Sequence, residues 1–233
     1  MSWAEVFKIN NNMKKPLNEQ MRDVKFQPIR IVTSTGTFKP EKTGLYKVIC
    51  VGAGGDGNNY RSSDSAHALA SGGGGGVAIK TLRLLSTTSY NVTVGTTASF
   101  THESGSLTAT AGSTGTPRDV IGGTGGTASG GDFNYTGTNG SSFYANTSSN
   151  RRLCPSPGSV GVFISDLSRS VESTWVIINP EYGTCQIRYG DSILGYGGAG
   201  SAVSDLNTDP KMETVIVDGL PAAVIIVPLE MEG

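Results

Sequence analysis

Hydrophobic and polar residues alternate with a period of two along much of the chain after residue 28, as expected for strands buried on one face. Tyr90, Val92 and Val94, for example, are separated by single polar residues. Strands are predicted at 29–33, 45–51, 77–82, 90–94, 107–111, 160–164, 175–178, 215–217 and 222–227. The last range is apolar at every position, so we expect it to be a central strand buried on both faces.

These strands are closely spaced, their connections are rich in glycine, and they do not alternate with helices. The pattern predicts an all-β fold, a glycine-rich antiparallel sandwich or jelly-roll-like domain with long loops, over residues 29–233. The side chains expected in its core are Cys50, Val92, Leu107, Trp175 and Ile225.

Residues 1–28 follow a different pattern, that of two short helices. Ser2 and Glu5 form a capping box, and Pro16 suits the first turn of a second helix. Their apolar side chains are Trp3, Val6, Phe7, Met13, Leu17 and Met21. Helices this short need a partner surface, which is either the chain's own domain or another protein or copy. We interpret the segment as a helical attachment or oligomerisation segment, with these side chains as its assembly interface.

Four connections are predicted to be loops: 56–71, 112–119, 132–157 and 194–210. Structureless loops longer than about 12–15 residues are uncommon in compact domains and are usually functional or disordered. This favours loops that display a binding surface. The candidate receptor-binding residues are aromatic side chains in polar surroundings between the predicted strands: Tyr60, Phe133, Tyr135, Phe143, Tyr144, Tyr182 and Tyr196. Such rings stack on sugars or protein groups, although they equally serve to pin loops to a scaffold.

Glycine runs punctuate the same connections, at 72–76, 122–126 and 195–200. Glycine tracts are usually flexible linkers. However, only glycine lets extended backbones approach closely enough to pack against one another. Several runs within one strand-rich domain favour ordered packing.

Composition narrows the classes of function. Glycine occupies 33 of 233 positions, about twice the usual share, and only 16% of residues are charged. A net charge of −1 offers no field to attract nucleic acid. No apolar run is long enough to insert in a membrane, and no secretory signal is recognised. The three widely separated cysteines do not form a disulfide framework, which is typical of assembly in a reducing cytosol.

Gly52–Gly57 matches a dinucleotide-binding fingerprint, yet no helix is predicted after it to hold a pyrophosphate. The two histidines, His67 and His102, belong to no ligand cluster. We therefore expect no cofactor, no metal site and no catalytic residue, and a protein that is not an enzyme. Glycoside hydrolysis remains an alternative, because it needs two nearby carboxylates. The candidates are Asp64, Glu103, Asp119 and Asp132.

Taken in order, these strands and glycine runs resemble the glycine-rich domain at the tips of bacteriophage and prophage tail fibres. The matching pieces include Thr37–Pro40, Gly44–Gly55, Gly72–Val77, Lys80–Leu82, Tyr90–Gly95, Ser99–Phe100, Gly105–Gly112 and Pro221–Val227. The likeness covers 31–112 and 215–229, but not 130–210.

The resemblance implies a virion protein of the tail, assembled in the host cytoplasm, which is either a homotrimer or a cap on a trimeric fibre. Its partners would be other tail or baseplate proteins and a glycan or protein of the host surface. The expected function is host binding by a tail fibre or baseplate tip. The alternatives are a glycan depolymerase of a tail spike and a purely structural tail or neck subunit.

Overall fold

A computed structural model describes residues 28–61, 66–146, 152–153, 155–162, 168–169, 175–179, 183–186, 190, 192–205 and 214–232. These residues form antiparallel strands and one short 3₁₀ helix, η1 (Pro117–Asp119). The all-β, antiparallel fold class is therefore confirmed. The expected N-terminal helices and their six apolar side chains lie outside the described residues.

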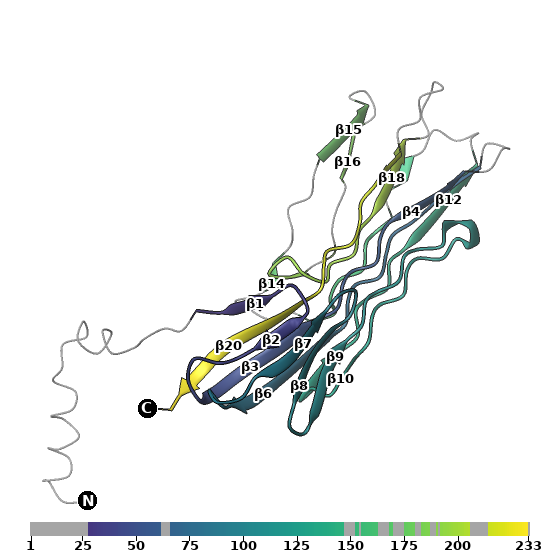
Figure 1. Ribbon diagram of the computed structural model, residues 1–233. Helices are drawn as coiled ribbons and strands as arrows, with labels where there is room; N and C mark the ends of the chain where they lie inside the picture. The colour runs from purple at the N-terminus through teal and green to yellow at the C-terminus, as the bar shows by residue number, and fades with distance from the viewer. Residues whose placement is uncertain are drawn as a thin grey trace, which may run out of the picture.

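Two five-stranded sheets pack face to face at one end of the molecule, which we call the base (Figure 1). Sheet A has the order β1 (Arg30–Val32), β20 (Ala223–Met231), β3 (Gly44–Val51), β6 (Val77–Leu84) and β11 (Phe133–Tyr135). Sheet B has the order β10 (Ala128–Ser129), β9 (Gly105–Ala109), β8 (Ala98–His102), β7 (Tyr90–Val94) and β2 (Gly36–Phe38). The first and last described strands are thus neighbours, and both described chain ends lie at the base.

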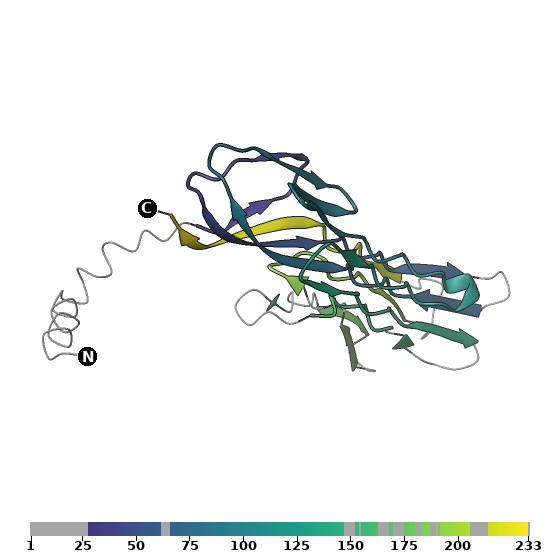
Figure 2. The ribbon, with the colours of Figure 1, turned by 90° about the horizontal axis from the view of Figure 1, so that it is seen from below.

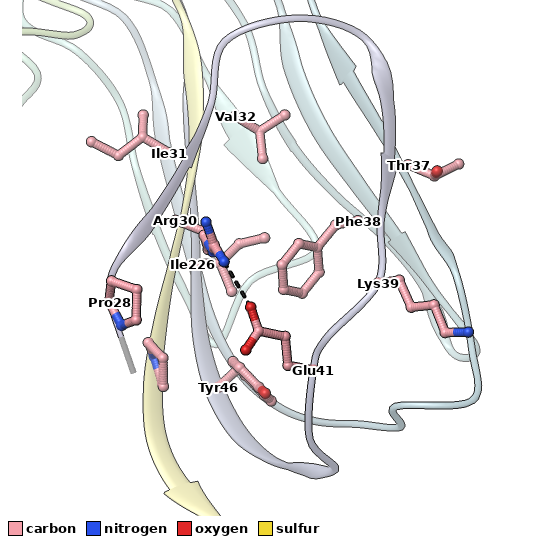
Figure 3. Close-up of a pocket in the computed structure, with 11 residues that line it drawn as sticks. Pro28, Arg30, Ile31, Val32, Thr37, Phe38, Lys39, Glu41, Tyr46 and Ile226 are labelled. Carbon is pink, nitrogen blue, oxygen red and sulfur yellow. Dashed lines mark hydrogen bonds and ion pairs between the residues drawn. The ribbon is translucent and has the colours of Figure 1, made fainter. Parts of the chain in front are cut away.

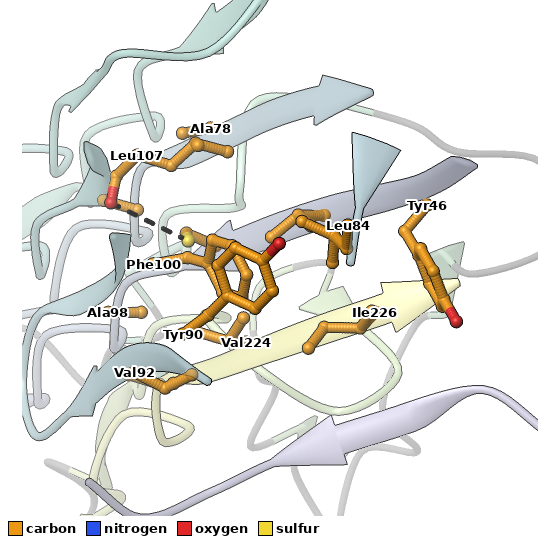
Figure 4. Close-up of a cluster of buried hydrophobic side chains, with 14 residues drawn as sticks. Tyr46, Ala78, Leu84, Tyr90, Val92, Ala98, Phe100, Leu107, Val224 and Ile226 are labelled. Carbon is orange, nitrogen blue, oxygen red and sulfur yellow. Dashed lines mark hydrogen bonds between the residues drawn. The ribbon is translucent and has the colours of Figure 1, made fainter. Parts of the chain in front are cut away.

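The main core fills the space between the two sheets (Figure 4). Cys50, Val92 and Leu107 are fully or almost fully buried there, as predicted. Tyr90 stacks on Phe100 with ring centroids 5.5 Å apart. Strand alternation places every second residue of β3 and β20 in this layer.

A second core covers the opposite face of sheet A. Ile225 lies in it with no exposed surface, as predicted, beneath Val160 and Ile193. Residues 222–226 of the last strand are all buried, which confirms a central strand packed on both faces. The side chain of Trp175, also expected in the core, is outside the described part.

Between the base and the far end, the chain forms a bundle of extended segments without sheet pairing, which we call strings (Figures 1 and 2). The central string is 71–76. Its backbone amides donate hydrogen bonds to three other strings in turn. Gly72 and Gly75 donate to the string 197–201, Gly73 and Gly76 to the string 110–115, and Gly74 to the string 136–141. Its backbone carbonyls accept hydrogen bonds from the three remaining strings. Ser71 and Gly74 accept from the string 122–127, Gly73 and Gly76 from the string 52–57, and Gly72 from the string 155–160.

The partner string therefore recurs every third residue, which is the repeat of a polyproline-II-like backbone with three residues per turn. Hydrogen bonds also join the six outer strings to one another in a closed ring: 52–57, 110–115, 122–127, 136–141, 155–160, 197–201 and back to 52–57. The central string is thus enclosed on all sides by backbone. The glycine runs are ordered packing elements, as favoured, and not flexible linkers.

Only glycine fits at positions 72–76 of the central string. A Cβ atom on Gly74 would overlap the carbonyl oxygen of Ser159, and one on Gly73 would overlap that of Thr124. Strands continue directly into strings, since β3 leads into 52–57 and 71–76 leads into β6. The bundle is therefore a continuation of the sandwich rather than a separate linker.

Hydroxyl groups connect the outer strings at the same three-residue spacing. The pairs are Thr110 with Thr127, Ser113 with Thr124, Thr138 with Ser159 and Ser141 with Ser156. The Thr138 hydroxyl, for example, accepts from the Ser159 amide at 2.7 Å and donates to its carbonyl at 3.4 Å. This explains why serine and threonine replace charged residues in this chain.

We expect Thr138→Val to lower the free energy of unfolding by about 1–2 kcal/mol, because the shape is kept while the amide of Ser159 loses its acceptor. Denaturant unfolding monitored by circular dichroism measures this difference. Thr37→Val, at an exposed position of β2, is the matched control. Equal midpoints for the two variants would contradict a stabilising role for the hydroxyl pairs.

The chain forms strands where long loops were expected. The predicted loop 56–71 contains β4 (Asn58–Arg61) and β5 (Ala66–Ala70), and the loop 132–157 contains β11 of sheet A and β12 (Ser142–Asn146) of a small sheet beyond the bundle. The remaining strands are β13 (Arg152–Leu153), β14 (Ser168–Arg169), β15 (Trp175–Asn179), β16 (Gly183–Gln186), β17 (Ser192–Ile193), β18 (Ala202–Asp205) and β19 (Thr214–Ile216). These loop predictions were wrong because the polar strands lack a long apolar alternation, and β8 was missed for the same reason. The strand expected at 160–164 is also not present at residues 161–162.

Candidate functional site

The candidate site is the three-stranded sheet β12–β5–β4, at the end of the molecule remote from both described chain ends (Figure 1). We call this sheet, with η1 and the two residues after η1, the tip. Three of the expected receptor-binding aromatic residues gather here. The exposed fractions are 41% for Tyr60, 47% for Phe143 and 53% for Tyr144.

Two of these rings share one face of the sheet. Tyr60 on β4 and Tyr144 on β12 both pair with Ala68 on the central strand β5. Residues paired across a sheet point to the same side, and two strand spacings separate the tyrosines by about 9–10 Å. The small side chain of Ala68 therefore lies between two exposed phenol rings.

The same face carries η1, which fixes its position through polar contacts. Asn58 donates to the carbonyl of Gly115 at 3.2 Å, and the Ser142 hydroxyl donates to the carbonyl of Val120 at 2.6 Å. Asn58 and Ser142 lie two residues from Tyr60 and Tyr144, and so on the same side of the sheet. The short helix is thus packed beside the two rings.

Val120 follows η1 in a left-handed conformation, with φ of 57°. A β-branched residue there is strained by roughly 1–3 kcal/mol, and such strain tends to concentrate at functional sites. Val120 and Ile121 are 41% and 55% exposed. Backbone hydrogen bonds between Thr116 and Ile121 hold this turn, which leaves two large apolar side chains exposed on the tip.

Phe143 points to the other side of the sheet, because it pairs with Leu69 one position away from Ala68. Leu69 is buried, whereas Phe143 remains about half exposed. The tip therefore offers aromatic or aliphatic surface on both of its faces.

The structure separates the other expected aromatic residues from the tip. Phe133 is 60% exposed but belongs to β11, the edge strand of sheet A at the base. Tyr135 and Tyr196 pack against the second core, which is the pinning role left open by the sequence. Tyr182 lies outside the described residues.

Sequence reasoning missed Val120 and Ile121. The available signal was Thr116-Pro117, since proline favours the first turn of a helix and so indicated a folded turn within the expected loop 112–119. The outward direction of Val120 and Ile121 could not be predicted, because it depends on tertiary contacts with β12.

A hollow of about 290 Å³ opens at the base between β1 and β2 (Figure 3). Val32, Phe38 and Ile226 line its apolar wall, and Arg30 and Glu41 form an ion pair of 2.7 Å across it. Burial is the main cause that raises the pKa of Tyr46, whose hydroxyl donates to the carbonyl of Lys42. The hollow is an open edge of the sandwich and holds no constellation of reactive groups.

Titratable groups elsewhere show no catalytic arrangement in the described part of the chain. Burial raises the pKa of Cys50 to about 12, so its thiol stays protonated in the core. Partial burial is the main cause that lowers the pKa of His102, and the positive charge of Lys80 lowers it further. Across the described ranges, no group of three histidine, cysteine or acidic side chains is placed to hold a metal. His67 is described only by its backbone in β5.

The carboxylates considered for glycoside hydrolysis lie on different elements. Glu103 is in the turn between β8 and β9 at the base, whereas Asp119 belongs to η1 at the tip. Asp132 accepts from the Thr81 amide and pairs with Lys80 at 3.7 Å. Asp64 lies outside the described residues.

The dinucleotide-like motif Gly52–Gly57 is one string of the bundle. The amides of Gly52, Gly54, Gly55 and Gly57 all donate to carbonyls of neighbouring strings, and strand β4 follows the motif instead of a helix. These amides are thus not directed at a phosphate.

No helix within the described ranges has the length and apolar character needed to cross a membrane. No curated protein and no solved structure matches the chain. A family model described as a glycine-rich domain matches residues 33–216, which include both sheets except β1 and β20, and all the strings. The chain therefore belongs to the glycine-rich domain family.

Proposed function

We propose that this protein attaches a bacteriophage, or a phage-tail-like particle, to the surface of its bacterial host, as a non-enzymatic tip of a tail fibre or baseplate. The observation that carries the proposal is the gathering of Tyr60, Phe143 and Tyr144 on a sheet at the end remote from the base. The base anchors the chain, the string bundle is a spacer, and the tip contacts the host.

The bundle supports this division because its backbone hydrogen bonds make it a stiff spacer. The tip supports it because exposed aromatic rings beside apolar side chains are typical of binding surfaces, where tyrosine contributes large contact area at little cost in conformational entropy. A host-surface glycan or protein is the proposed ligand. No catalytic group, metal or cofactor has a part in this mechanism.

The phage origin rests on the sequence resemblance, and so do the virion location, assembly in the host cytoplasm and contacts with other tail or baseplate proteins. A trimeric arrangement would suit the tip, because three weak contacts to one cell surface reinforce each other through their effective concentration.

We expect the double variant Tyr60→Ala, Tyr144→Ala to bind host cells at least about tenfold more weakly than the unmodified chain, because exposed tyrosines in contact surfaces are often binding hot spots. Fluorescently labelled protein, titrated onto a panel of bacteria, measures the affinity for the species that bind. Both positions are exposed, so unfolding should be unchanged.

Phe133→Ala is the matched control, since it removes an aromatic ring that is 60% exposed but lies on the base. Equal loss of binding in the control and the double variant would argue against the tip. No binding of the unmodified chain to any bacterium would favour a purely structural tail subunit.

A further inference from the structure

The outer face of sheet A carries one continuous apolar row across all five strands. Its members are Ile31, Ile225, Ile49, Ile79 and Phe133, each paired with the next in the strand register. In the middle of the row, Ile225 and Ile49 are fully buried by the second core. At the β1 edge, Ile31 remains 43% exposed.

Closer to the base end, the second core no longer covers this face. An apolar surface remains there, which we call the base patch: Ile29, Ile31, Leu45, Val227 and Leu229. Ile29 is 43% exposed, Leu45 38% and Leu229 50%, whereas Val227 is partly buried. Leu229 lies in the irregularity of β20 between Pro228 and Glu230.

Charged residues lie beside the apolar residues of the base patch. Val227 pairs with Lys47, and Leu45 pairs with Arg83 on one neighbouring strand and with Glu230 on the other. Arg83 in turn forms an ion pair of 2.6 Å with Glu232. Grouped exposed apolar side chains bordered by polar residues are typical of a protein interface.

The chain itself provides an occupant. Residues 1–27 precede the described part and carry the six apolar side chains Trp3, Val6, Phe7, Met13, Leu17 and Met21. The two short helices predicted for this segment from its sequence would need a partner surface, and the base patch begins at Ile29, where the segment ends.

The geometry at Pro28 favours a patch on another copy. Going back along the chain from Val32 to Pro28, β1 runs antiparallel to β20, whose end lies at the base. The described chain therefore begins at the end of sheet A, and its direction there points away from the patch of the same copy.

We propose that the base patch binds the N-terminal segment of a second copy of this chain. Such a contact joins two different surfaces. Contacts of this kind close into a ring when the rotation between copies closes, and form filaments otherwise; a homotrimer requires closure after three copies. The inference rests on the trimeric arrangement suggested under the proposed function and is independent of ligand binding at the tip.

Light scattering on the purified full chain tests the contact. We expect a homotrimer for the unmodified chain and a threefold lower mass for Ile31→Glu, because the charge would be buried against the apolar segment. Ile216→Glu is the matched control, as Ile216 is the same residue type with the same 43% exposure but belongs to β19. A trimeric Ile31→Glu, or a monomeric unmodified chain at micromolar concentration, would overturn the proposal.

The mass of the unmodified chain distinguishes exchange between copies from folding back within one copy, and a mixing experiment tests whether the segment of one copy binds the patch of another. Phe7→Glu impairs the segment and leaves the patch intact, whereas Ile31→Glu does the reverse. Each variant alone should be a monomer, and an equimolar mixture should give a species of twice the monomer mass through the one intact contact. A mixture that stays monomeric would overturn the proposal, and circular dichroism of each variant verifies that both are folded. Cell binding measured for each monomeric variant reports separately on the tip.

Discussion

Gly74→Ala should lower the free energy of unfolding by more than about 3 kcal/mol and the melting temperature by roughly 10 °C. A methyl group at this position overlaps the carbonyl oxygen of Ser159 in a neighbouring string. Backbone surrounds the central string on all sides, so the clash is relieved only by separating strings. The hydrogen bond from Gly74 to Thr138 and the one from Gly126 to Gly74 would then lengthen or break. Thermal unfolding monitored by circular dichroism gives the difference.

Gly36→Ala is the control for this prediction. A Cβ atom on Gly36 has no neighbour within 4 Å, and its backbone is not in the left-handed region. The substitution should therefore leave the melting temperature unchanged within a few degrees, or raise it slightly through the entropy of the unfolded chain. A similar effect of the two substitutions would mean that the strings are not tightly packed in solution.

Ile225→Asn should destabilise the fold by about 3–5 kcal/mol. The side chain is fully buried in the second core. Its replacement loses roughly 1.5–3 kcal/mol of apolar burial and leaves an amide without partners, at a further cost of about 1–3 kcal/mol. Chemical denaturation and the yield of soluble protein measure the effect.

The matched control is Ile121→Asn, at a position 55% exposed on the tip. Its unfolding midpoint should stay close to that of the unmodified chain. Soluble Ile225→Asn protein with an unshifted midpoint would contradict the place of β20 as an inner strand of sheet A that is packed on both faces.

The sequence predicted those strands that bury a large apolar face. Val48 to Val51 and Ala223 to Ile226 could be recognised because tertiary burial and local pattern coincide there. Polar strands such as β4 and β12 could not, since their stability comes from pairing with β5 and from contacts with η1. Hydrophobic alternation carries no information about either.

The glycine runs were recognised as candidates for ordered packing, but the arrangement of the strings was beyond the sequence. Which strings neighbour Gly74 depends on hydrogen bonds to segments more than 40 residues away, namely 122–127 and 136–141. Thr110 and Ser113 are three residues apart in the sequence, as are Thr138 and Ser141. This spacing indicates hydroxyl contacts between strings only when the partner string of each residue is known.

The aromatic candidates at the tip show the same limit. Tyr60, Phe143 and Tyr144 share their polar surroundings with Tyr135 and Tyr196, and composition alone does not separate binding rings from pinning rings. The strand register made the separation, by placing the first three on one small sheet and the other two against the second core.

Hydrogen–deuterium exchange of the full chain, with and without envelope material from a bacterium that it binds, tests the proposed role of the tip most directly. The account predicts slower exchange on binding at the amides of β4, η1 and β12, and unchanged exchange in β7, β8 and β9 of the base. Protection confined to the base, with none at the tip, would contradict attachment through Tyr60, Phe143 and Tyr144.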